Sequence, residues 1–205
     1  MLKDYKIVLA TNNAHKVGEF EKLFFYHLGK EVKIYTLKEI GFEGDIVENG
    51  RTFSENALIK ASAVAGEGIV AIADDSGLCV DALDGAPGIY SARYAGTGND
   101  KDNNNKLLEE LKGVSYRDAS FVCALACIFP ESSGIDPFVC KGVCRGEILL
   151  SERGKGGFGY DPLFWVDSKG KTFAELTEDE KNVISHRGDA VNVLIGELRR
   201  IGQID

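Results

Sequence analysis

Short apolar runs that alternate with helical patterns constrain the fold of this chain more than any other feature of its sequence. Residues 6–10 form a run typical of a buried strand, and apolar residues at helical spacing follow over residues 17–28. Residues 69–73 repeat the strand pattern, and residues 117–129 and 137–143 indicate two long successive strands. Strands that alternate with helices, with long strands adjacent in the middle, predict an α/β fold with a mixed central sheet flanked by helices.

Local signals place the ends of further elements. Thr52-Phe53-Ser54-Glu55 matches a capping box, in which Thr52 caps a helix and Glu55 reaches back, and we expect this helix to run towards Ala65. The other predicted elements are strands at residues 33–36 and 163–166 and helices that begin at His15, cover residues 100–111 and cover residues 177–201.

Length and charge limit the possible functions. The 205 residues suit a single domain, residues 1–205, with two lobes. The net charge of −8 argues against binding to nucleic-acid polymers, which needs a basic surface, but a small nucleotide needs only a few cationic side chains and a metal ion. We find no targeting segment, and the longest uncharged apolar stretch, residues 119–130, is too short to span a bilayer. We therefore expect a cytoplasmic protein that binds no membrane.

The five cysteines indicate a reducing compartment and free thiols, because their number is odd. Cys123 with Cys127, and Cys140 with Cys144, form two pairs at a spacing of four, so a zinc site is an alternative. Structural zinc usually takes a tighter spacing, and no histidine lies near these pairs, so buried thiols are favoured.

Two adjacent carboxylates follow the apolar run at residues 69–73. We expect the strand to end at Asp74 and an extended pattern to resume at residues 78–80. Ligands of open α/β sheets bind beyond the carboxyl ends of strands, and magnesium prefers carboxylate oxygens. Neighbouring strand residues point to opposite faces, so only one of Asp74 and Asp75 need face a ligand. Glu48 offers a second metal carboxylate, although a plain turn and a solvated loop glutamate are the alternatives.

Two lysines occupy unusual helix positions. Residues 11–16 form a strand-to-helix junction, where backbone N–H groups and the helix dipole favour an anion. Lys16 and Lys60 are each expected in the first two turns of a helix, where a cation is unfavourable unless it meets an anion. A phosphate would satisfy both lysines, whereas the alternative is a pair of surface lysines whose charges extend into water.

Residues 154–159 satisfy the pattern GxGxxG, but a dinucleotide site needs that motif to open a helix, and Tyr160-Asp161-Pro162 follows instead. We interpret the segment as a flexible loop that lets the backbone approach a ligand. Phe158 or Tyr160 would offer a stacking face, and Asp161 a hydrogen-bond acceptor. A tight structural turn is the alternative.

A patch of donors occurs late in the chain. Lys181, Ser185, His186 and Arg187 lie within two turns of the predicted final helix. A solvated helix face is the alternative. Ser185 and His186 do not indicate a catalytic triad, because neighbours in sequence pair poorly as nucleophile and base and no GxSxG motif is present.

Seven short segments follow one another in a set order along nearly the whole chain. They are Thr11-Asn12-Asn13-Ala14-His15-Lys16; Glu48, Gly50, Thr52-Phe53 and Glu55-Asn56-Ala57 with Lys60; Ala73-Asp74-Asp75-Ser76-Gly77-Leu78; Pro87-Gly88-Ile89-Tyr90-Ser91-Ala92-Arg93; Gly156-Gly157-Phe158-Gly159-Tyr160-Asp161-Pro162; Glu175-Leu176 with Lys181; and Ser185-His186-Arg187. In this order they resemble the inosine triphosphate pyrophosphatase family, whose members act on deaminated purine nucleotides.

The resemblance implies a homodimer and two lobes around a nucleotide cleft, built on an elongated mixed sheet. It also implies Mg²⁺-dependent attack of water on the α-phosphorus, which gives a nucleoside monophosphate and pyrophosphate. By position, Asp75 resembles the catalytic carboxylate and metal ligand, with Glu48 as a second metal-side acid. The implied substrate-binding residues are Thr11, Asn12, Asn13, Ala14, His15, Lys16, Lys60 and Ser76 on the phosphate side, and Phe158, Gly159, Tyr160, Asp161, Lys181, His186 and Arg187 in the base pocket.

The residue types suit that task. Mg²⁺, Lys16 and Lys60 would neutralise the phosphate charge, and Asp75 would position the water, either as a base or through a metal-bound water. Hypoxanthine and xanthine carry a carbonyl acceptor at position six where adenine carries an amino donor, so donors from His186 or Arg187 could reject adenine by roughly 10⁴-fold or more. Two alternatives stay open: a nucleotide-binding sensor without turnover, and a pyrophosphatase of another nucleotide class, such as pyrimidine triphosphates.

Overall fold

The computed structural model describes residues 1–29 and 33–205. Its strands are β1 (Lys6–Leu9), β2 (Ile34–Thr36), β3 (Ile69–Val80), β4 (Asp118–Ile128), β5 (Phe138–Ile148), β6 (Phe164–Val166) and β7 (Lys171–Thr172). Its α-helices are α1 (Ala14–Leu28), α2 (Phe53–Ser62), α3 (Asp100–Glu110), α4 (Glu178–Ile184) and α5 (His186–Arg200). No helix among the described residues combines the length and apolar character needed to cross a bilayer.

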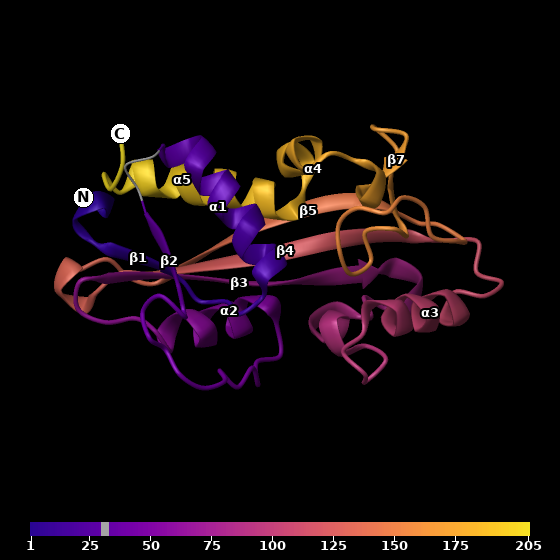
Figure 1. Ribbon diagram of the computed structural model, residues 1–205, viewed down its shortest axis with the longest axis horizontal. Helices are drawn as coiled ribbons and strands as arrows, with labels where there is room; N and C mark the ends of the chain where they lie inside the picture. Colours follow the sequence, from indigo (N-terminus) through magenta and orange to yellow (C-terminus); the bar gives the residue numbers. More distant parts are fainter. Residues whose placement is uncertain (30–32) are drawn as a thin grey trace. The chain divides into compact units, whose positions relative to one another are not determined.

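The strands form one seven-stranded sheet in the order β2-β1-β3-β4-β5-β6-β7 (Figure 1). β1 pairs in parallel with β2 and β3, whereas β6 pairs antiparallel with β5 and β7. The sheet is therefore mixed and is flanked by helices, which confirms the predicted α/β class.

The chain divides into two compact units. The first comprises Met1–Asp75, Cys123–Gly142 and Arg187–Asp205, and the second comprises Ser76–Val122 and Val143–His186. β3, β4 and β5 each contribute residues to both units. Because the division cuts across long strands, each unit is assembled from segments that are separated in the sequence.

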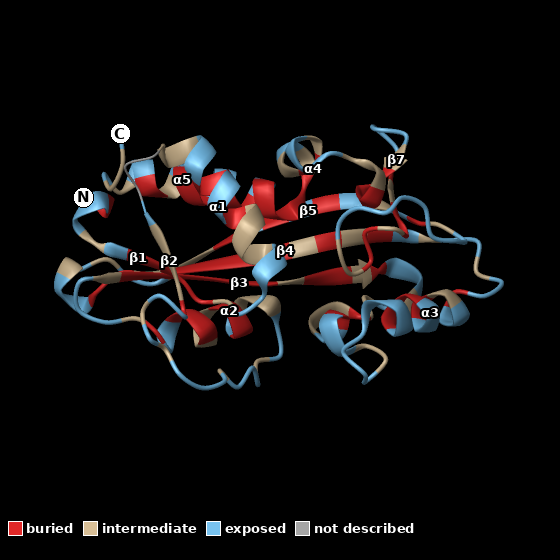
Figure 2. Ribbon diagram, in the orientation of Figure 1, coloured by how far each residue is buried: buried red, intermediate tan, exposed pale blue. Residues whose placement is uncertain are grey.

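In the first unit, helices cover both faces of the sheet. α1 and α5 lie on one face and α2 lies on the other (Figure 1). Ile7 and Leu9 of β1 pack in one apolar cluster with α1 and α5, whereas Val8 and Ala10 pack in another with Ala57 of α2. β1 is therefore buried from Ile7 to Leu9 (Figure 2). Burial on both faces explains why the strand is a continuous apolar run in the sequence.

In the second unit, aromatic rings form much of the core. Phe121 of β4 and Phe164 of β6 have ring centroids 4.7 Å apart, and Phe173 stacks on Phe121 at 5.6 Å. Leu107 and Leu111 at the end of α3 belong to the same buried cluster. These residues come from widely separated parts of the sequence, so this core depends on tertiary packing.

β3 runs without a break from Ile69 to Val80, so the predicted end of the strand at Asp74 is wrong. Gly77 lets the chain around Ser91 approach the strand, since a Cβ at Gly77 would lie 2.4 Å from Ser91 Oγ. The Ser91 hydroxyl in turn accepts a hydrogen bond from the Leu78 N–H at 2.9 Å. The two carboxylates therefore lie within the strand and not beyond it.

The capping box at α2 is only half confirmed. Thr52 Oγ1 accepts from the Glu55 N–H at 3.1 Å, but the Glu55 carboxylate accepts from the Arg51 N–H at 2.6 Å and not from Thr52. α2 ends at Ser62, before the predicted Ala65. β5, by contrast, continues to Ile148, past its predicted end at residue 143.

The predicted C-terminal helix is in fact two helices, α4 and α5. Ser185, with ψ 157°, is extended and ends α4. Serine is favoured at the residue that precedes a helix, because its side chain can satisfy first-turn N–H groups. The break places His186 and Arg187 at the start of α5.

Candidate functional site

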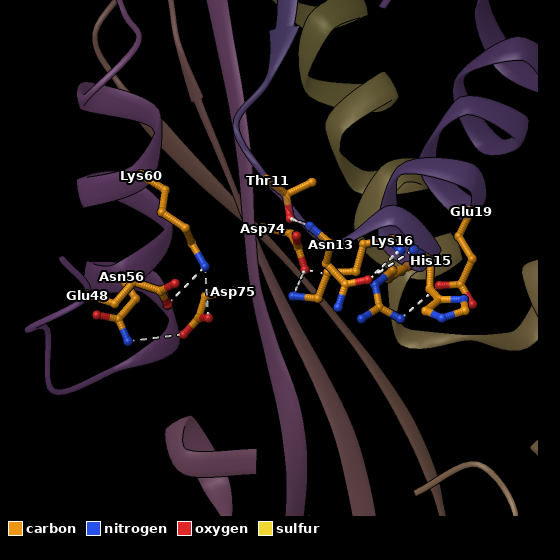
Figure 3. A network of polar contacts seen from close by, with 11 residues as sticks. Thr11, Asn13, His15, Lys16, Glu19, Glu48, Asn56, Lys60, Asp74 and Asp75 are labelled. Atoms are coloured by element: carbon orange, nitrogen blue, oxygen red, sulfur yellow. Dashed lines mark hydrogen bonds and ion pairs between the residues drawn. The ribbon is translucent and has the colours of Figure 1, made fainter. Parts of the chain in front are cut away.

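Asp74 and Asp75 point to opposite sides of β3 (Figure 3). Asp74 Oδ2 accepts a hydrogen bond from Lys16 Nζ at 2.8 Å, and Asp75 Oδ1 accepts one from Lys60 Nζ at 3.0 Å. Neighbouring strand side chains alternate between the two faces, as the sequence predicted. Asp74 and Asp75 are therefore hydrogen-bonded to different lysines, and both lysines belong to the first unit.

The Asp74 carboxylate is fully buried and is surrounded by cations. Lys16 of α1 contacts it directly, and Arg187 Nε of α5 lies 3.9 Å from the same oxygen. Burial alone would raise the pKa of Asp74, but Lys16, Arg187 and Lys60 together hold it well below its usual range. Arg187 Nη1 also pairs with Glu19 Oε2 of α1 at 2.8 Å. Asp74 is thus an anion at neutral pH that contacts cations of both α1 and α5.

Asn13 caps the N-terminus of α1. Asn13 Oδ1 accepts from the N–H groups of His15 and Lys16 at 3.0 and 3.1 Å, and Thr11 Oγ1 accepts from the Asn13 N–H at 3.2 Å. Residues from Asn12 to His15 are exposed. In the predicted phosphate-binding segment, the side chain of Lys16 reaches a carboxylate, and that carboxylate is Asp74.

The Asp75 carboxylate has polar partners on α2, one of which also binds Glu48 of the preceding loop. Lys60 Nζ lies 3.0 Å from Asp75 Oδ1 and 3.0 Å from Glu48 Oε2, and Asn56 Nδ2 donates to Asp75 Oδ2 at 3.2 Å. Burial raises the pKa of Asp75, and the opposing effects of Lys60, Lys16 and Asn56 do not fully offset it. Asp75 therefore carries a charge that its present neighbours only partly stabilise.

Lys60 lies in the last turn of α2, so the prediction that it occupies the first two turns is wrong. The helix is short and Thr52 caps it, which leaves Lys60 near the end where the dipole favours a cation. Burial opposes the charge, but Asp74, Asp75 and Glu48 together raise the pKa of Lys60 above its ordinary value. Lys60 is therefore a buried side chain and not a surface lysine.

Asn56 is a site residue that the sequence reasoning did not assign. Asn56 precedes Lys60 by four residues on α2, so the two side chains share one helix face. Its carbonyl Oδ1 accepts from the Gly50 N–H at 2.8 Å, which orients the amide towards Asp75. A Cβ at Gly50 would lie 2.7 Å from that oxygen, so glycine is required there. The four-residue spacing was the signal that could have found Asn56.

Glu48 and Asp75 form a pair of carboxylates in this unit that could hold a metal ion. Among the described residues, no group of three or more His, Cys, Asp and Glu side chains is arranged to do so. Two carboxylates are nevertheless enough for Mg²⁺, which usually completes its shell with waters and substrate phosphates. The side chain of Glu48 is one-third exposed, so a ligand can reach it. The five cysteines are free thiols, as predicted.

In the second unit, the glycine-rich loop is held by internal contacts. Asp161 Oδ2 accepts from the Phe158 N–H at 3.0 Å and from Lys181 Nζ at 2.7 Å. Tyr160 is buried, and its hydroxyl donates to the Ser91 carbonyl at 2.9 Å. Tyr160 and Asp161 thus fit the alternative interpretation, a structural turn. Phe158 is only partly buried, with Lys181 Nζ 5.0 Å from its ring centroid.

The donor patch near the C-terminus is not a solvated helix face. Lys181, Ser185, His186 and Arg187 are all buried. The His186 ring stacks on Phe121, with centroids 4.8 Å apart and planes 12° from parallel. Burial of these polar side chains needs compensating partners, so they have defined positions in the folded chain.

Comparison with known proteins identifies the family. The model of the Ham1 family matches residues 7–197. The chain belongs to the Ham1 family. It is 48% identical to a dITP/XTP pyrophosphatase of Clostridium perfringens, over 96% of this chain and 98% of that protein. It is 49% identical to a dITP/XTP pyrophosphatase of Synechocystis, over 92% of this chain and 93% of that protein.

Solved structures of Ham1 proteins share the fold. The Ham1 protein of Staphylococcus aureus has a TM-score of 0.84 at 41% identity, over 96% of this chain and 99% of that one. The Ham1 protein of Coxiella burnetii has a TM-score of 0.84 at 45% identity, with the same coverage. These findings confirm the resemblance drawn from the seven ordered segments.

Proposed function

We propose that this chain hydrolyses non-standard purine nucleoside triphosphates, such as those of inosine, deoxyinosine and xanthosine, to the nucleoside monophosphate and pyrophosphate. The observation that carries the proposal is the Lys60 ammonium, which lies 3.0 Å from both Glu48 and Asp75. Two carboxylates held beside a cation suit a divalent ion and a phosphate chain. The relatives named dITP/XTP pyrophosphatases supply the class of substrate.

Glu48 and Asp75 would hold Mg²⁺ in this proposal. The raised pKa of Asp75 supports it, because burial there is only partly offset by the neighbouring cations and a divalent ion would supply the missing positive charge. When bound, the ion supplies charge neutralisation at the phosphate oxygens. The oxygen donors of this pair match the preference of a hard cation and not that of zinc.

Asp75 would act as the general base. A water attacks the α-phosphorus, the bond from that phosphorus to the oxygen bridging to the β-phosphorus breaks, and pyrophosphate leaves. Asp75 accepts the proton of the attacking water. Burial raises the pKa of Asp75 in the absence of the ion, and a bound Mg²⁺ would lower it again. The carboxylate would therefore be deprotonated near pH 7 and able to accept that proton.

The phosphate chain would be bound by the cations of the first unit. Lys16 and Lys60 each hold a carboxylate now, and a bound triphosphate would share those ammonium groups. The segment from Thr11 to His15, which leads into α1 and is exposed from Asn12 onward, would add the positive end of the helix dipole. Ser76, which follows Asp75 in β3, would lie beside these groups.

The base would be selected by stacking and by donors. Phe158 would stack on the purine, beside Gly159, Tyr160 and Asp161 of the same loop. Lys181, His186 and Arg187 would offer N–H donors to the carbonyl at position six. An amino group there would face these donors without an acceptor, which can reject adenine by roughly 10⁴-fold.

We also propose a cytoplasmic homodimer of two-lobed subunits, with the nucleotide bound in a cleft, on the strength of the family resemblance. Size-exclusion chromatography with light scattering tests the dimer directly. A monomer at micromolar concentration would contradict it.

The decisive experiment is a panel of nucleoside triphosphates assayed with Mg²⁺ for both pyrophosphate and orthophosphate. We expect pyrophosphate from inosine, deoxyinosine and xanthosine triphosphates, much lower kcat/KM for standard and pyrimidine triphosphates, and no activity in EDTA. Orthophosphate alone would contradict the proposed bond cleavage. Binding of inosine triphosphate without product would indicate a sensor, and a preference for pyrimidine triphosphates would indicate another substrate class.

A further inference from the structure

Side chains from α3 bind both backbone groups of Gly159. Asp100 Oδ2 accepts a hydrogen bond from the Gly159 N–H at 2.7 Å, and Asn104 Nδ2 donates to the Gly159 carbonyl at 3.2 Å. Asp100 and Asn104 are four residues apart on α3, so their side chains lie on the same helix face. Gly159 has a φ of 60°, a left-handed conformation that other residues rarely adopt. The helix therefore fixes one particular conformation at this glycine.

The same helix also holds the start of the loop. The second N–H of Asn104 donates to Glu152 Oε1 at 3.0 Å, and Lys101 Nζ donates to Glu152 Oε2 at 2.8 Å. Asn104 is only 3% exposed, and its amide group donates to both Glu152 and Gly159 in this buried position. The segment between Glu152 and Gly159 is thus attached to α3 at both ends.

Phe158 lies at the end of that attached segment. Its own N–H donates to Asp161 at 3.0 Å, and the next peptide group is bound by Asp100. Two successive N–H groups are therefore fixed by carboxylates on either side of the Phe158 Cα. The direction in which the Phe158 ring leaves the backbone follows from these contacts.

We propose that Asp100 and Asn104 are positioning residues that hold the Phe158 ring in the orientation needed to stack on the purine. The proposal rests on the function proposed above, in which Phe158 supplies the stacking face. Neither residue touches the substrate in this account. Asp100 and Asn104 would orient the Phe158 ring through their hydrogen bonds to the backbone of Gly159.

The effect should appear in binding and not in turnover. Stacking of a base on an aromatic ring accounts for roughly 5- to 150-fold in affinity by alanine substitution. Loss of the Asn104 contacts would misplace the Phe158 ring and remove part of the affinity that stacking contributes. We therefore expect Asn104→Ala to raise KM for inosine triphosphate about tenfold. A change in substrate binding that is equal in the ground and transition states leaves kcat unchanged.

A double-mutant cycle tests the proposal. KM and kcat for inosine triphosphate are measured for the wild type, Asn104→Ala, Phe158→Ala and the double variant. If Asn104 acts through Phe158, Asn104→Ala changes KM less than about twofold once Phe158 is absent, because the two effects are coupled. Equal KM increases in both backgrounds, or a loss confined to kcat, would overturn the proposal.

Two matched variants complete the design. Asn105→Ala makes the same substitution at an exposed neighbour on α3, and we expect wild-type KM and kcat. If Asn104→Ala fails to fold, two variants of Asp100 provide the test. Asp100→Ala should raise KM for inosine triphosphate. Asp100→Asn keeps an acceptor for the Gly159 N–H, so its KM should stay near the wild-type value. Equal KM values for these two Asp100 variants would overturn the proposal.

The wild-type assay distinguishes failure of the proposed role of Asp100 and Asn104 from failure of the proposed function. Wild type that releases pyrophosphate from inosine triphosphate, together with additive KM effects in the cycle, would refute the role of α3 and leave the proposed function standing. Wild type that does not act on inosine triphosphate would refute both.

Discussion

The ammonium group of Lys60 lies 3.0 Å from the Asp75 carboxylate, although both side chains are buried. Burial disfavours each charge, and each of the two side chains helps to stabilise the charge on the other. The pKa of Asp75 is nevertheless raised. Asp75 is therefore held as a base whose strength depends on a neighbouring cation.

Lys60→Met should shift the pH dependence of activity. Only deprotonated Asp75 can accept a proton, so kcat/KM falls on the acid side as pH drops below the pKa of Asp75. Lys60 lowers that pKa, so its removal raises the pKa further and moves the acid limb of the profile to higher pH. kcat/KM of the wild type, Lys60→Met and Lys60→Arg is measured against pH at saturating Mg²⁺. Lys60→Arg keeps the charge and should keep the limb near its wild-type position, and an unmoved limb in Lys60→Met would refute the coupling.

Asp74→Asn should destabilise the fold in a pH-dependent manner. The variant leaves Lys16 and Arg187 without their buried counter-ion, which typically costs about 3–5 kcal/mol of unfolding free energy at neutral pH. The pKa of Asp74 is lowered in the folded state, so its stabilisation is complete above the unfolded pKa of about 3.9 and is lost as pH falls through the folded pKa. Urea unfolding of both proteins from pH 7 to pH 3 should show the difference shrinking below about pH 4. A difference that is constant over this range would contradict the account.

Two glycine substitutions should have opposite effects on stability. A Cβ at Gly77 would lie 2.4 Å from Ser91 Oγ and 2.5 Å from the Gly88 carbonyl, so Gly77→Ala should destabilise by roughly 1–3 kcal/mol through overpacking. Gly18 lies inside α1 with nothing within 4 Å of such a Cβ, so Gly18→Ala should stabilise by about 0.5–1 kcal/mol. Urea unfolding measures both. Equal effects of the two substitutions would show that the close approach at Gly77 does not matter.

Much of the fold could be predicted from the sequence because its signals are local. The apolar run at residues 6–10 and the helical spacing after it identify β1 and α1. The break at Ser185 was missed, because residues on both sides of it fit a helical pattern. The continuity of β3 was missed as well, because two adjacent carboxylates resemble a turn until the cations that stabilise them are known.

The candidate site was less accessible, because its contacts join distant parts of the chain. Arg187 lies near Asp74 and pairs with Glu19, which is 168 residues away in sequence, and no periodicity in the sequence encodes that contact. Asn56 was within reach, since it shares a helix face with Lys60. The residues named by the family resemblance include Lys16, Lys60 and Asp75, but the resemblance did not reveal that the lysines are already paired with carboxylates.

Glu48→Gln should weaken the affinity for Mg²⁺ without removing catalysis. Glutamine keeps the size of the side chain but loses the negative charge that would help to hold Mg²⁺. We expect the Mg²⁺ concentration for half-maximal activity to rise at least about tenfold, the lower end of the range for groups that only orient a metal ligand. Titration of activity with Mg²⁺ measures the shift, and an unchanged midpoint would exclude Glu48 from the metal site.

The most direct test is the rate of pyrophosphate release by Asp75→Asn with inosine triphosphate and Mg²⁺. Asparagine preserves the shape of the side chain and can still contact Lys60, but it accepts no proton and is a poor metal ligand. Circular dichroism and thermal unfolding first establish that the variant is folded. We predict a loss of about 10²-fold or more in kcat, as expected when a general base is removed. A folded variant that turns over at close to the wild-type rate would contradict the central claim.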